Sequence, residues 1–292
     1  MTNADFEKRR RKMLRAVAAN LEGVLPPGTP VREGGKRGVW HALADHLRVD
    51  ELREPLQAIA AGPGHELRET GTGQVAMGSV ESSALMTVNF FAPFAKRAGS
   101  LFGLSDGTLT FEKELRVTGV RAPVGPTLDA ALDAPGGSVF VEAKSAEPWR
   151  GPPKVSLSTQ YDAPAKAHSP ETLITLEALR SGDLTYTCLD AAQFLKHLLG
   201  IATALERSIV TGSAKLCLLF WRPADAGPYA DMFNRLEAEF DDLAARLDDQ
   251  DVELVRRGTT DLLDDWFDGS KPKWLQAHAA ALRCRYDQPL TG

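Results

Sequence analysis

The sequence predicts an α/β fold in which a central mixed β-sheet is flanked by helices. Short segments rich in Thr, Val, Phe and Leu alternate with longer segments whose apolar residues recur at helical spacing. Two of the short segments are separated only by APGG (134–137), which indicates a hairpin. Another, SAKLCLLFWRP (213–223), is almost continuously apolar, as expected of a strand that is covered on both faces.

The first part of the chain is predicted to be helical. Apolar residues recur at helical spacing within residues 4–22, and a second helix is expected over 50–61. The basic run KRRRK (8–12) is typical of a solvated helix face, although it could also contact phosphates. We therefore expect an N-terminal helical extension, residues 1–78, packed on an α/β core, residues 79–292, within one domain.

Strands and helices alternate through the core. A largely buried helix is expected over 80–98, with Pro93 kinking it or marking its last turn. A long polar stretch with one short helix follows the hairpin, and such connections are often functional or mobile. The predicted strands cover 108–120, 127–133, 138–145, 213–223 and 251–257, and the later helices cover 169–180, 188–206, 230–249 and 273–285.

Composition limits the function classes. The net charge of −5 argues mildly against a nucleic-acid partner, unless the basic residues gather in one cleft. The odd count and wide spacing of Cys188, Cys217 and Cys284 do not suggest a disulfide framework or a zinc site. No segment approaches the roughly 20 apolar residues of a membrane span, and no signal peptide is apparent. We expect a cytoplasmic protein with no membrane partner.

The segment SVFVEAKS (138–145) carries the residues best suited to chemistry. Side chains on a strand alternate between faces, so Glu142 and Lys144 share one face while Val141 lies on the other. An acid and an amine on a buried strand are costly unless they are paired or bind a ligand. If they only pair with each other, they are an ion pair of little energetic consequence.

The hairpin supplies a third polar residue. If APGG is the loop, Asp133 pairs with Ser138, and Asp129 then lies directly opposite Glu142 with Cβ atoms about 5 Å apart. Two carboxylates at that distance repel each other unless a cation lies between them, and hard oxygen ligands select Mg²⁺ or Mn²⁺. Asp133 would lie roughly 13 Å from Glu142 and is better explained as a turn residue. Asp129 could also be a polar residue on an edge strand.

A strand-borne Glu-x-Lys that follows an Asp across a hairpin resembles the signature of the PD-(D/E)XK nuclease superfamily, whose fold is restriction-endonuclease-like. Here the pieces are GPTLDAAL (125–132) and VFVEAKS (139–145), and the Pro of the signature is not immediately before Asp129. Further segments are similar to bacterial proteins assigned to this superfamily as restriction endonucleases: SSALMTVNFFAPF (82–94), TFEKEL (110–115), VEAKSAEPW (141–149) and LTYTCLDAAQFLKHLLGI (184–201). The resemblance covers roughly residues 80–260.

The resemblance implies Mg²⁺-dependent (or Mn²⁺-dependent) hydrolysis of DNA phosphodiester bonds, with water as the nucleophile. Asp129 and Glu142 would bind the metal, and Lys144 would assist the attacking water. Glu112 would be an additional metal ligand, with Glu114 as a competing candidate. The list of catalytic residues is completed by Gln193, which matches a polar position lining such sites.

Alternatives remain open at several positions. Trp149 and Arg150 could contact nucleic acid, but Trp149 could equally cover the edge of the core. His197 follows Gln193 by one helical turn and is expected to be an ordinary helix residue, although it could face the same cleft. Tyr161 and Lys166 could reach a backbone phosphate.

The function itself also has alternatives. A nuclease-like fold can lack catalysis and act as a nucleic-acid-binding or assembly module, because fold does not dictate function. Hydrolysis of RNA or another phosphodiester is a further candidate. Cutting both strands of a duplex often needs two active sites, so we also consider a homodimer.

Overall fold

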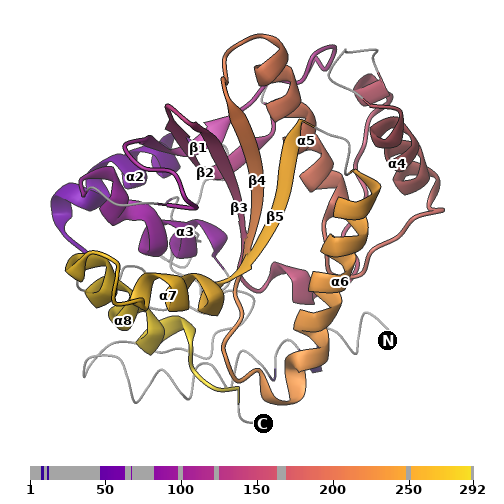
Figure 1. Cartoon of the computed structure of the whole chain (residues 1–292). Coiled ribbons are helices and arrows are strands. Elements are labelled where there is room, and N and C mark those ends of the chain that lie inside the picture. The colour runs from indigo at the N-terminus through magenta and orange to yellow at the C-terminus, as the bar shows by residue number, and fades with distance from the viewer. Residues whose placement is uncertain are drawn as a thin grey trace.

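A mixed five-stranded sheet in the order β1-β2-β3-β4-β5 lies at the centre of the protein (Figure 1). The first three strands are antiparallel neighbours, whereas β3, β4 and β5 run parallel. The predicted α/β class with a mixed sheet is confirmed. The strands are β1 (Thr108–Glu114), β2 (Thr127–Ala134), β3 (Gly137–Lys144), β4 (Ser213–Phe220) and β5 (Val252–Gly258).

The computed structural model describes residues 8, 9, 12, 47–62, 67, 82–97, 101–121, 125–162, 169–247 and 251–290. Most of the predicted helix over 4–22 lies outside these residues, as does Lys166. Within the basic run, Arg9 forms an ion pair of 2.7 Å with Asp231, and its guanidinium lies over the ring of Tyr229. No helix in the described part of the chain is long and apolar enough to cross a bilayer.

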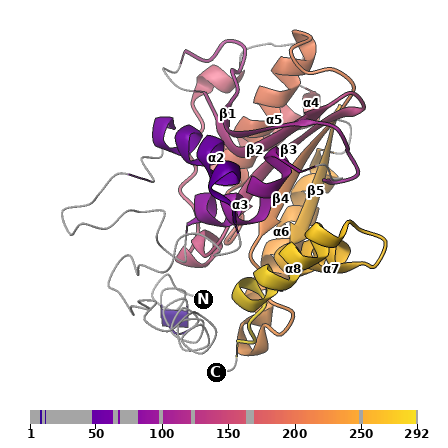
Figure 2. The same cartoon turned by 90° about the vertical axis from the view of Figure 1, so that its left-hand side faces the viewer.

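Helices cover both faces of the sheet (Figures 1 and 2). On one face, α2 contacts β1, α3 contacts β2 and β3, and α7 contacts β5, while α8 packs on α7. On the other face, α5 and α6 contact the parallel strands, and α4 packs on both helices. The α-helices are α2 (Val49–Ala61), α3 (Ser83–Phe91), α4 (Pro170–Ser181), α5 (Ala191–Glu206), α6 (Ala230–Arg246), α7 (Thr259–Phe267) and α8 (Lys273–Tyr286). Short 3-10 helices cover Ala92–Ala95 (η2), Glu147–Arg150 (η3), Thr159–Asp162 (η4) and Gly227–Tyr229 (η5).

The β2–β3 hairpin has the predicted register. Asp133 pairs with Ser138, but Ala134 also pairs with Gly137, so the turn consists of Pro135 and Gly136 alone. Gly137 has a φ of 144°, and a Cβ there would approach the backbone oxygen of Ser213 to 2.3 Å. Glycine is therefore required where the hairpin turns beside the start of β4.

Strand β3 is covered on both faces, and all its residues except Lys144 are buried. The Val141 face lies on the side of α3, which contacts β3. The Glu142 and Lys144 face lies on the side of α5, because both side chains contact residues of that helix. The predicted alternation along 138–145 thus separates an apolar layer from a charged one.

Several predicted elements have different bounds. The helix predicted over 80–98 is α3, which ends at Phe91 and passes into a 3-10 turn at Pro93, where the missing amide proton cannot continue the helix. The strand predicted over 108–120 ends at Glu114. Helix α5 begins at Ala191 because the Asp190 carboxylate caps it by accepting from the Gln193 amide at 2.9 Å.

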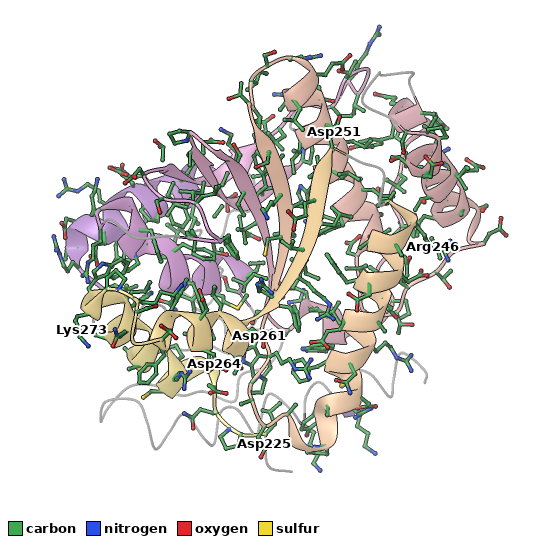
Figure 3. All side chains as sticks on the ribbon, viewed as in Figure 1. Asp225, Arg246, Asp251, Asp261, Asp264 and Lys273 are labelled. Carbon is green, nitrogen blue, oxygen red and sulfur yellow. The ribbon has the colours of Figure 1, made fainter. Side chains whose placement is uncertain are left out.

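Helix α7 was not predicted. It has only nine residues and follows β5 without a loop. Asp261 lies in its first turn (Figure 3), and its carboxylate accepts from the amide of Gly258 at 3.2 Å. A short helix adjoining a strand offers little periodicity to detect, since two turns give few repeats of the apolar face.

Candidate functional site

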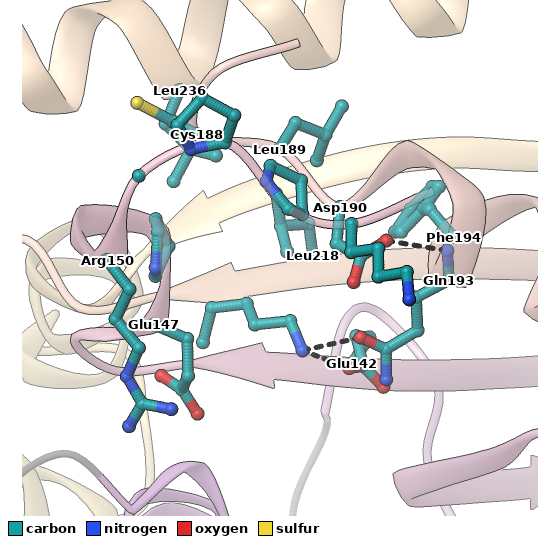
Figure 4. A pocket seen from close by; sticks show the side chains of 16 residues that line it. Glu142, Glu147, Arg150, Cys188, Leu189, Asp190, Gln193, Phe194, Leu218 and Leu236 are labelled. Atoms are coloured by element: carbon teal, nitrogen blue, oxygen red, sulfur yellow. Dashed lines mark hydrogen bonds and ion pairs between the residues drawn. The ribbon is translucent and has the colours of Figure 1, made fainter. Parts of the chain in front are cut away.

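A buried cluster joins strand β3 to the first turns of α5. The Lys144 ammonium donates to Glu142 Oε1 at 2.7 Å and to Gln193 Oε1 at 2.8 Å (Figure 4). Glu142 and Lys144 meet because residues two apart share a strand face, and Gln193 projects from the helix above them. Three of the residues named from the sequence are therefore in direct contact.

His197 extends this cluster by one helical turn. It is 1% exposed, and its Nε2 lies 3.0 Å from Glu142 Oε2. Its Nδ1 has no hydrogen-bond partner among the described residues. The expected helix-surface or semi-buried position is wrong for His197, and the alternative that it shares a cleft with Gln193 fits its contact with Glu142. The four-residue spacing from Gln193, which puts both side chains on one helix face, was the available signal.

Asp129 lies beside the cluster on β2. The β2–β3 pairing ends at Ala130 and Val141, and Asp129 and Glu142 are the next residues beyond it on the two strands. The side chain of Asp129 is half-buried, and its Oδ2 accepts a hydrogen bond of 2.7 Å from the Ala143 amide. The direct pairing predicted for the two acids lies one step beyond the paired residues, but the charge of Glu142 still acts on Asp129.

Glu142 is ionised at neutral pH. Burial acts to raise its pKa, but the Lys144 ammonium and His197 outweigh burial and hold the pKa at about 2. Burial likewise acts to lower the pKa of Lys144, yet the carboxylates of Glu142, Glu147 and Asp129 raise it above its usual range. The pair is consequently a true ion pair in a buried setting.

The pKa of Asp129 is shifted in the direction opposite to that of Glu142. Burial, followed by the negative charge of Glu142, raises its pKa well above the usual value, although Lys144 and the Ala143 amide act against this. The site thus holds two neighbouring acids of which one ionises readily and the other resists ionisation. Additional positive charge near Asp129 would relieve that resistance.

Glu112 lies at the margin of this group. The β1–β2 pairs Phe111–Ala130 and Lys113–Leu128 place Glu112 across from Asp129, but its φ of 51° interrupts the strand pairing there. Its carboxylate packs against Gly62 at the end of α2, where a Cβ would lie 2.7 Å from Oε2. Its charge nevertheless contributes to the raised pKa of Asp129.

The competing acids have local roles. Glu114 accepts from the Gly125 amide at 2.8 Å and pairs with Arg116 at 2.8 Å. Asp133 accepts from the Ser138 hydroxyl at 2.7 Å and faces Lys113 at 3.4 Å, as expected of a turn residue. Across the described ranges, no group of three or more His, Cys, Asp or Glu side chains is placed to hold a metal ion.

Two cavities open beside the cluster. One of about 280 Å³ is lined by Glu142, Lys144, Glu147, Arg150 and Gln193 among others (Figure 4). The other, of about 360 Å³, adjoins it and shares Lys154, Asp190 and Gln193 as lining residues.

Trp149 does not line the first cavity. Its side chain is fully buried with its ring 4.7 Å from that of Phe233, which settles it as a core residue rather than a stacking platform. Arg150 follows it, is exposed, and lines the first cavity. Of this pair, only Arg150 is placed where it could contact a ligand in the cavity.

Models of known protein families, curated proteins and solved structures were all compared with this chain, and none matches it.

Proposed function

We propose that the protein is a nuclease of the PD-(D/E)XK type with a restriction-endonuclease-like fold, which hydrolyses DNA phosphodiester bonds with Mg²⁺ or Mn²⁺. The observation that carries this proposal is the buried Glu142–Lys144 ion pair beside Asp129 at the wall of a cavity. Buried ion pairs stabilise a fold little, so their presence at a cavity favours a chemical role.

The donor set fits a hard divalent cation. Mg²⁺ is commonly held by only one or two carboxylates together with waters and substrate phosphates, and Asp129 and Glu142 supply two. The raised pKa of Asp129 indicates a place where added positive charge is favourable. Glu112 is a further candidate acid at the margin. When bound, the cation would supply Lewis-acid stabilisation of the charge that develops on the phosphate.

The chain's own residues would complete the chemistry. Lys144 lines the cavity and keeps its ammonium charged, so it can donate to a phosphate oxygen or orient the attacking water. Gln193 holds that ammonium through its side-chain oxygen and thereby positions it. The half-enclosed cavity would limit access of bulk water and strengthen these interactions.

A plasmid-cleavage assay tests this proposal. Purified protein is incubated with plasmid DNA and Mg²⁺ or Mn²⁺, beside the Glu142→Gln variant and a matched control, Glu253→Gln. Glu253 is an exposed acid on β5 that pairs with Lys215 at 2.6 Å. We expect Glu142→Gln to lower the cleavage rate at least about 100-fold and Glu253→Gln to leave it unchanged. Equal rates for wild type and Glu142→Gln would refute the assignment.

A binding or assembly module without catalysis is the second candidate. It is favoured by the net charge of −5 and by the contacts that already occupy both oxygens of Glu142. Titration calorimetry with Mn²⁺ separates the two. Heat that disappears in Asp129→Asn and Glu142→Gln supports the nuclease, whereas no heat in the wild type supports the module.

The type of polymer that is cut, the oligomeric state and the cytoplasmic location remain predictions. Parallel assays with DNA and RNA decide the polymer, and light scattering coupled to gel filtration decides whether the chain forms a homodimer. A cytoplasmic location is checked by fractionating cells that make the protein.

A further inference from the structure

The second cavity has no part in the proposed reaction, yet it adjoins the residues that would perform it. It is lined by Lys154, Ser156, Tyr161, Gln193, Lys196 and His197 among others. Because Gln193, Lys154 and Asp190 also line the first cavity, the two spaces are direct neighbours. A ligand at Lys144 that extends in this direction would enter the second cavity.

Charge and helix position make the second cavity attractive to an anion. Among the described lining residues, Lys154 and Lys196 are the cations and Asp190 is the one acid. Asp190 directs its carboxylate to the Gln193 amide, as the cap of α5. The cavity lies at the first turns of this 16-residue helix, where the partial positive charge of the helix dipole is concentrated.

His197 provides an independent indication of a ligand. Its ring is 1% exposed and lines the second cavity; Nε2 faces Glu142 Oε2 at 3.0 Å, and Nδ1 has no hydrogen-bond partner within the described residues. A buried polar group without a partner costs about 1–3 kcal/mol, so such a group in a cavity wall is suited to meeting a polar ligand.

Tyr161 completes the wall. It is buried in the 3-10 helix η4, and the Lys196 ammonium lies 5.9 Å from the centre of its ring. This contact restrains the ammonium at the cavity. An ammonium beside an aromatic ring is complementary to a nucleotide. The ammonium can pair with the phosphate, and the ring can contact the base or sugar.

We propose that the second cavity binds a phosphate group of a single polynucleotide strand, on a nucleotide neighbouring the one held at Lys144. The inference rests on the proposed function for the identity of the polymer. Lys154 and Lys196 neutralise the phosphate, the amino end of α5 adds partial charge, and His197 supplies a hydrogen bond.

Salt-dependent strand binding tests the proposal. A fluorescent single-stranded DNA of twelve nucleotides is titrated with protein in EDTA, so that no cleavage occurs, and anisotropy is followed at several salt concentrations. The variants are Lys154→Gln and Lys196→Gln. The matched control is Lys273→Gln on α8, which lies across the sheet from α5 (Figure 3).

Each cavity variant should lose one phosphate contact. The slope of log affinity against log salt should fall by about 0.7, which corresponds to a loss of about fivefold at about 0.1 M salt. The control should keep the slope and affinity of the wild type, and thermal melting verifies that every variant is folded. Unchanged slopes for both cavity variants overturn the proposal, as does a wild type that fails to bind the strand.

Two further arms separate the alternatives. If inorganic phosphate displaces the strand only at concentrations far above the dissociation constant of the strand, the polymer is the ligand; equal affinity shows a free-anion site and overturns the proposal. Because binding is measured in EDTA, it is independent of cleavage. A wild type that binds through Lys154 and Lys196 but cuts no DNA would refute the nuclease and retain this site.

Discussion

The two faces of strand β3 are both covered by helices, but their chemistry differs. Val139, Val141 and Ala143 lie on the apolar face, on the side of α3. Glu142 and Lys144 lie on the opposite face, toward α5. Apolar burial stabilises by about 25 cal/mol per Å², whereas burying an ion pair can cost more than the attraction returns. The apolar face therefore stabilises the fold, whereas the buried Glu142–Lys144 pair on the other face lowers the stability and keeps a charged group available for chemistry.

The largest effect is expected when the ion pair is broken on one side. Lys144→Met leaves the Glu142 carboxylate buried without its ammonium and should lower the free energy of unfolding by about 3–5 kcal/mol. The double variant Glu142→Leu/Lys144→Met should recover the wild-type free energy to within about 1 kcal/mol, without cleavage. Urea unfolding measures both values, and a double variant as unstable as the single one would contradict the comparison.

Asp129 should make stability depend on pH. Its pKa is raised in the folded protein, so the wild type loses free energy of unfolding as pH rises from the unfolded-state pKa, about 4, through the folded pKa. Asp129→Asn does not titrate. In EDTA, the free energy of unfolding of Asp129→Asn minus that of the wild type should therefore increase between pH 4 and pH 8. The increase should be about 1.4 kcal/mol per unit of pKa shift. A difference that does not change with pH would show that the pKa of Asp129 is not raised in the folded protein.

On the apolar face, a truncation should affect stability alone. Val141→Ala removes two buried carbon atoms and should lower the free energy of unfolding by about 2 kcal/mol. Cleavage per folded molecule should stay at the wild-type rate, because the side chain points away from α5. Loss of cleavage in the folded fraction would mean that the two faces are not independent.

The smallest effect is expected at the hairpin turn. Asp133→Asn keeps the shape of a half-exposed side chain that contacts Ser138 and Lys113, so the free energy of unfolding should change by less than about 1 kcal/mol. Cleavage should be unaffected, in contrast to Asp129→Asn, because Asp129 lies four residues nearer the cluster on the same strand face. If the two variants lost cleavage equally, the choice of Asp129 over Asp133 would be wrong.

The hairpin was predictable because its contacts are local. Once Pro135 and Gly136 define the turn, the pairing of Asp133 with Ser138 follows, and so does the pairing inward as far as Ala130 with Val141, next to Asp129 and Glu142. The contact between Lys144 and Gln193 spans 49 residues and was named from resemblance rather than from spacing. His197 was misjudged, since helix periodicity places it on the face of Gln193 but does not tell what that face covers.

Periodicity and turn chemistry alone determined the succession of strands and helices apart from α7, the β2–β3 register and the shared face of Glu142 and Lys144, because each depends on neighbours along the chain. Only the tertiary structure decided the parallel pairing of β3 with β4, the packing of α5 over the charged face, and the two cavities around Gln193. Those features arise from contacts between segments far apart in the sequence. The local sequence of one segment does not indicate which distant segment it will pack against.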